Sequence, residues 1–109
     1  MNGERQRNEI IGEAPVALVR DFATLPGWSV TMTSKGQWTT AERVLKVGGR
    51  QWVVGLTPTT GDATALMLWA DEILVTRVRG DERALCRTAC QWVGNLLAGR
   101  AWDAGTADG

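Results

Sequence analysis

The sequence predicts a single α+β domain: an antiparallel sheet of four to five strands, arranged as a meander, with a long amphipathic helix packed on one face. Two observations lead to this prediction. The stretch 81–99 repeats its apolar residues with helical periodicity, and the stretch 28–57 alternates apolar and polar residues between glycine-containing turns. A short helix is expected before the sheet.

The C-terminal helix is predicted from an apolar face that spans about 160° at roughly 100° per residue. Asp81 stands at the N-cap position, and Gly99 stands where a helix commonly ends. A face this wide requires a partner surface, which the strands upstream can supply. The apolar side holds Leu85, Cys86, Ala89, Cys90, Trp92, Val93, Leu96 and Leu97, and the polar side holds Arg83, Arg87, Thr88, Gln91 and Asn95.

Three strands are predicted over residues 28–34, 38–47 and 50–57. Lys35-Gly36 and Gly48-Gly49 are expected to be the two-residue turns that join them. Because side chains alternate between the two faces of a strand, these turns fix which residues share a face. The expected pairs are Val47–Arg50, Leu45–Trp52, Arg43–Val54 and Ala41–Leu56 on an inner, apolar face, and Lys46–Gln51, Val44–Val53, Glu42–Gly55 and Thr40–Thr57 on an outer, mostly polar face.

The same register makes a specific prediction for three of the six tryptophans. Trp28 and Trp52 are expected in the core, whereas Trp38 is expected on the outer face. Val30 is placed beside Ala41 on the inner face. A slip of one residue would exchange the two faces, so the apolar pattern selects this register.

Residues 63–78 allow two interpretations: a pair of strands bent at Ala70-Asp71-Glu72, or a helix over residues 63–70 followed by a strand. The hairpin is favoured because residues 73–76, ILVT, prefer extended structure. Residues 65–69 are apolar on both faces, which is typical of a strand covered on both sides. The helix covers one side, and we hypothesise that a second copy of the chain covers the other.

The remaining segments lie at the two ends of the chain. Residues 1–12 are predicted to be a flexible arm, residues 13–100 a single domain and residues 101–109 a frayed tail from which Trp102 docks on the helix. Residues 15–25 are predicted to form a short helix that begins at Pro15 and ends before Pro26-Gly27, with weak capping because Ala14 has no side-chain acceptor.

Composition argues against several functional classes. Twelve basic and twelve acidic residues cancel, which argues against a general polyanion binder. The absence of histidine removes the commonest general base and metal ligand, and there is no phosphate-binding glycine motif. We therefore expect a non-enzyme without a metal or other cofactor. Cys86 and Cys90 are expected to be reduced, apolar contacts with the sheet, in a cytoplasmic protein that has no membrane-spanning segment.

Tryptophan and arginine carry the remaining functional signal, because both are enriched in protein-binding surfaces. We predict a small protein-binding module, of the inhibitor, immunity or chaperone kind, that acts as a homodimer. One alternative is a regulator that binds single-stranded nucleic acid on the outer sheet face. Another is a small-molecule pocket between helix and sheet, lined by Trp28, Trp52 and Trp92. The candidate partner-binding residues are Trp38, Thr31, Thr33, Lys46, Gln51, Arg77, Arg79, Arg83 and Arg87.

The order of these elements resembles two kinds of protein: the small secretion chaperones that clasp a client as dimers, and single-stranded nucleic-acid binders with four strands and a helix. Neither resemblance rests on a sequence motif. No functional residue is therefore transferred from either family to this chain.

Overall fold

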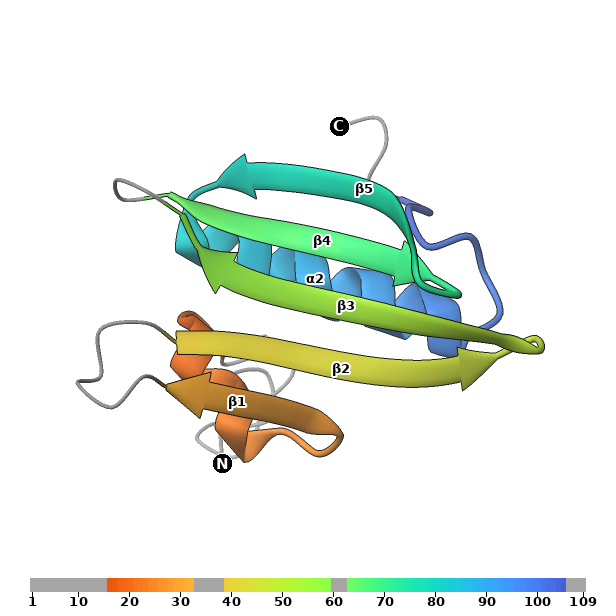
Figure 1. The fold of residues 1–109 in the computed structure, drawn as a ribbon, viewed down its shortest axis with the longest axis horizontal. Helices are drawn as coiled ribbons and strands as arrows, with labels where there is room; N and C mark the ends of the chain where they lie inside the picture. Colours follow the sequence, from red (N-terminus) through yellow and green to blue (C-terminus); the bar gives the residue numbers. More distant parts are fainter. Residues whose placement is uncertain (1–15, 33–38, 60–62, 106–109) are drawn as a thin grey trace, which may run out of the picture.

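The strands pair in the order in which they occur in the chain, β1-β2-β3-β4-β5, and every pair is antiparallel (Figure 1). The computed structural model describes residues 16–32, 39–59 and 63–105. Both helical elements lie on one side of the sheet, so the α+β prediction with a C-terminal helix is confirmed. The elements are η1 (Val19–Thr24), β1 (Trp28–Met32), β2 (Thr39–Val47), β3 (Arg50–Pro58), β4 (Thr64–Ala70), β5 (Ile73–Gly80) and α2 (Glu82–Leu97).

The predicted register is observed in the first two hairpins. Val30 pairs with Ala41, and Leu45 pairs with Trp52. Gly48 and Gly49 adopt φ values of 63° and 80°, a left-handed conformation that glycine reaches without steric cost and that closes a tight hairpin. The other predicted turn, Lys35-Gly36, lies outside the described residues.

The segment after β3 is the hairpin that its β-branched residues favoured, and the helical alternative for residues 63–70 is wrong. Its turn is formed by Asp71 and Glu72 at φ values of 50° and 72°, which are uncommon for residues with a side chain. Asp71 also anchors the turn to β3. Its backbone N–H donates to the carbonyl of Gln51 at 2.8 Å, and its Oδ1 accepts from the N–H of Gln51 at 3.0 Å.

The core lies between the sheet and α2. Asp81 caps the helix as predicted, since its Oδ2 accepts a hydrogen bond from the N–H of Ala84 at 3.0 Å. Gly99 ends the helix at a φ of 78°. The fully buried residues include Phe22 from η1, Val54 and Leu56 from β3, Leu66 and Leu68 from β4, and Cys86 and Ala89 from α2.

Two residues of α2 differ from the predicted wheel. Leu97, placed on the apolar face, is 58% exposed, and Asn95, placed on the polar face, is only 3% exposed. Asn95 is buried because the segment after the helix folds back over the last turns of α2 and contacts it. Trp102 packs edge-on against Trp92 with ring centroids 4.9 Å apart. The predicted docking of Trp102 is therefore confirmed, and residues 101–105 are ordered by it.

The N-terminal helix is shorter than the predicted span of residues 15–25. It is a single 3₁₀ segment, η1, and Pro15 lies outside the described residues. The missing cap is supplied from within the segment, because the Asp21 carboxylate accepts from the N–H of Leu18 at 3.0 Å. Glu82 joins η1 to α2, since its Oε2 accepts from the N–H of Val19 at 2.8 Å.

Trp28 and Trp52 lie on the inner face, as predicted, but they are half-buried and pack against the edge of the core instead of within it. The Trp28 ring lies against that of Phe22 with centroids 4.1 Å apart. Among the tryptophans that the structure describes, Trp92 is the one that is almost fully buried, with 2% of its surface exposed. The predicted position of Trp38 falls outside the described residues.

Candidate protein-contact surface

The face of the sheet opposite α2, here called the outer face, is covered by no helix or strand among the described residues (Figure 1). One line of apolar side chains crosses four strands of this face. Val44 pairs with Val53, Val53 pairs with Trp69, and Trp69 pairs with Leu74. We call these four residues the apolar row. Val44 is 52% exposed and Leu74 49% exposed, so the row is open to solvent at both ends.

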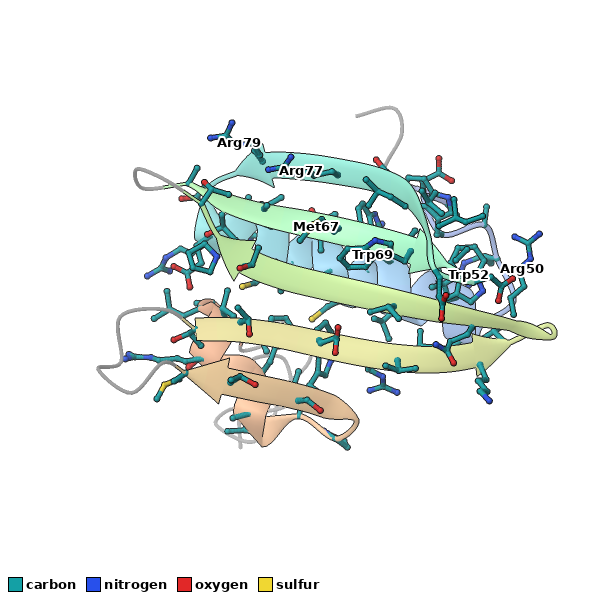
Figure 2. The ribbon with its side chains drawn as sticks, viewed as in Figure 1. Arg50, Trp52, Met67, Trp69, Arg77 and Arg79 are labelled. Atoms are coloured by element: carbon teal, nitrogen blue, oxygen red, sulfur yellow. The ribbon has the colours of Figure 1, made fainter. Side chains whose placement is uncertain are left out.

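A second line of residues, adjacent to the apolar row, begins with an acid and ends with a base. We call it the charged row. Figure 2 shows its Met67 on β4 beside Trp69, with Arg77 on the neighbouring β5. The two charged ends have no ion pair with another described residue. In order across the sheet, the charged row is Glu42, Gly55, Met67 and Arg77.

Gly55 leaves room for the Trp69 ring on the outer face. The ring lies over this position, so that a Cβ at residue 55 would be 3.3 Å from Cζ3 of Trp69. A hollow of about 180 Å³ opens beside Gly55 and is bordered by Met67, Trp69 and Glu42. A second hollow of about 300 Å³ lies against Trp69 and Val53. The outer face therefore has two hollows beside the half-buried indole of Trp69.

The structure brings together some of the predicted partner-binding residues and separates others. Alternation along the paired strands places five of them on the outer face: Thr31, Lys46, Gln51, Arg77 and Arg79. Arg83 and Arg87 are exposed on α2, in the opposite layer, so they do not share this surface. Thr33 and Trp38 lie outside the described residues.

The predicted partner-binding residues include polar residues of the outer face and none of its apolar ones, although the sequence also predicted an apolar outer side for residues 65–69. The signal was present in the register, which pairs Val44 with Val53 and turns Met67 and Trp69 away from the helix. The position of Leu74 depends on an irregularity between Leu68 and Trp69, where the pairing with β5 shifts by one residue. No turn signal in the sequence marks that shift.

The environment of the two cysteines disfavours the thiolate. Burial raises the pKa of the Cys86 thiol to about 12, assisted by electrostatic interaction with Glu82, Cys90, Asp21 and Asp81. Burial also raises the pKa of Cys90. Both groups are therefore protonated at neutral pH, which agrees with their predicted role as apolar contacts.

Residues 16–32, 39–59 and 63–105 give no evidence for a metal site or a membrane-spanning helix. That part of the chain holds no group of three or more histidine, cysteine or acidic side chains placed to bind a metal. None of the helices described there has the length and apolar character needed to cross a bilayer. Comparison of the chain with protein-family models, with curated proteins and with solved structures finds no match.

Proposed function

We propose that this chain is a non-catalytic protein-binding module and that the outer sheet face is its contact surface. The observation that carries the proposal is the apolar row, which crosses four strands without a covering element among the described residues. Burying an exposed valine or leucine side chain contributes about 1.5–3 kcal/mol, so the two ends of the row alone are a substantial source of binding free energy.

A protein partner explains the charges better than a nucleic acid does. The outer face carries Arg77 and Arg79, which favour phosphate, but also Glu42 and Glu72, which border its hollows and repel it. Mixed charge around an apolar centre is the composition expected of a protein interface. The nucleic-acid alternative rests on one feature, the two arginines beside Met67 and Trp69.

The proposal can be tested by placing a charge at either end of the apolar row. We expect Val44→Lys and Leu74→Lys to abolish capture of a partner by the purified protein from extracts of its native host. Leu97→Lys is the matched control, because Leu97 is an exposed leucine on α2 in the opposite layer. If Leu97→Lys reduces capture as much as the other two variants, the outer face is not the contact surface.

A titration with short oligonucleotides separates the two functional classes. A protein-binding module should leave tryptophan fluorescence unchanged at low salt. Quenching at low salt that disappears at high salt would support the nucleic-acid alternative instead, because salt weakens phosphate contacts.

We also propose a cytoplasmic location. Cys86 and Cys90 are free thiols, which fit a reducing compartment.

A further inference from the structure

We propose that the partner on the outer face is a second copy of this chain, packed face to face about a twofold axis that runs parallel to the strands, between β3 and β4. This inference rests on the proposed contact surface and specifies its occupant. Two sheets stacked in this way lie about 10 Å apart, with their strands within roughly 30° of alignment.

The symmetry determines which residues meet. A twofold axis parallel to the strands places each cross-strand row over the same row of the second copy, in reversed order. With the axis between β3 and β4, strand β2 lies over β5 of the second copy, and β3 lies over β4. The residues of each row must therefore be complementary to those of the same row taken in the opposite order.

The charged row meets this requirement at both ends. Glu42 lies over Arg77 of the second copy, and the symmetry repeats this ion pair on the other side. The centre between these two ion pairs is apolar, because Met67 lies over Gly55 of the second copy and over the Trp69 ring that covers that glycine. An acid opposite a base is the simplest form of complementarity.

The apolar row satisfies the same condition. Val44 lies over Leu74 of the second copy, and Val53 lies over Trp69 of the second copy. Each of the four side chains thus meets another apolar one. The indole of Trp69 meets the smaller valine, which lies beside the hollow of about 300 Å³.

One alternative, a twofold axis that runs across the strands through the charged row, gives the opposite result. It places Glu42 over Glu42 of the second copy and Arg77 over Arg77 of the second copy. Like charges facing each other in an interface cost several kcal/mol. The charge pattern therefore disfavours that axis.

The size of the face fits a weak dimer. With the axis between β3 and β4, the four strands β2 to β5 face the second copy; they are seven to nine residues long. At a spacing of about 4.8 Å they present a face on the order of 500 Å². Standard protein interfaces bury about 800 Å² on each partner, so this face is smaller than the standard size.

The test is a charge exchange between Glu42 and Arg77, measured by sedimentation equilibrium. We expect Glu42→Arg and Arg77→Glu each to raise the dimer dissociation constant by at least about tenfold, because each variant places like charges opposite one another twice. An equimolar mixture of the two variants should form a heterodimer, because one ion pair is then restored with exchanged signs and the other is the unchanged pair of Glu42 and Arg77. Arg83→Glu is the control, since it makes the same change in charge on the opposite layer.

Three results would overturn the inference, and each leaves the proposed contact surface open to its own test. If both variants dimerise like the wild type, or if their mixture fails to form a heterodimer, the arrangement is wrong. Loss of the dimer in Val44→Lys would then still place an interface on the outer face. If the wild type is monomeric at about 1 mM, a concentration that would populate even a weak dimer, a second copy is not the occupant. The capture experiment would then decide whether another protein is.

Discussion

At the scale of single residues, the turn between β4 and β5 holds a removable source of backbone strain. Glu72 has a φ of 72°, a conformation that a residue with a Cβ adopts at a cost of about 1–2 kcal/mol. Glycine avoids that cost but loses more entropy on folding, so we expect Glu72→Gly to stabilise the protein by about 0.5–1 kcal/mol. Urea unfolding measures the difference. Glu72→Ala, which removes the same charge but keeps the Cβ, should give no such gain.

The buried thiol of Cys86 leads to a second prediction at this scale, which concerns the pH dependence of folding stability. In the unfolded chain the thiol titrates near pH 9, whereas burial raises its pKa in the folded protein to about 12. Above pH 9 the unfolded state binds fewer protons than the folded state, so stability is complete below pH 9 and is lost as the pH rises toward 12. Chemical unfolding at a series of pH values should show this loss.

The matched variant for the pH prediction is Cys86→Ala. Its stability should be lower at neutral pH because of the cavity, but it should decline less steeply above pH 9. Parallel curves for the wild type and the variant would mean that the Cys86 thiol does not titrate differently in the two states.

At the scale of elements, Asn95 holds the segment after α2 in place. Its Nδ2 donates to the carbonyls of Trp102 and Ala104 at 2.8 and 3.0 Å, and its Oδ1 accepts from Nε and Nη2 of Arg100 at 3.2 and 3.0 Å. Because Asn95→Ala leaves partly buried carbonyls without donors, we expect it to destabilise the protein by about 2 kcal/mol. It should also release Trp102, which near-ultraviolet circular dichroism and limited proteolysis of the tail would detect.

Gln91 provides the control for Asn95. Its Nε2 reaches the same Ala104 carbonyl only at 3.5 Å and from an exposed position. Gln91→Ala should therefore change stability by less than about 0.5 kcal/mol. An equal effect of the two variants would show that the tail is not held through Asn95.

The elements differ in how far the sequence could predict them. The hairpins were predictable because Gly48-Gly49 fixes a register that only one placement of the apolar residues satisfies. The 3₁₀ segment η1 was harder, since its N-terminal end is capped from inside by Asp21 and from 63 residues away by Glu82. Asn95 was misplaced for a related reason. Its polarity suggested solvent, but its partners belong to a turn that forms only after the helix has ended.

At the scale of the whole molecule, the outer face was predictable as a surface but not in its details. The register identified which residues of β2, β3 and β4 lie on it. Arg77 and Arg79 lie on it, whereas Arg83 and Arg87 lie on α2 in the opposite layer, as their place on the polar side of the predicted helix already implied. The pairing of β4 with β5 shifts in register between Leu68 and Trp69, and this shift brings Leu74 into the apolar row. It is a feature of how the two strands pair, which the local sequence does not mark.

The proposed dimerisation through the outer face has a consequence for the stability of the whole molecule. If folding and association are coupled, the unfolding temperature rises with protein concentration by mass action. Each tenfold increase in concentration adds about 1.4 kcal/mol per dimer, which for two chains of this length corresponds to a shift of about 3 °C. Scanning calorimetry over a hundredfold range of concentration should show that dependence for the wild type and for an equimolar mixture of Glu42→Arg and Arg77→Glu. Neither variant alone should show it, because each keeps the core between α2 and the sheet but loses the complementary charges of the second copy. A midpoint for the wild type that is independent of concentration would mean that the outer face contributes nothing to the stability of the fold through self-association.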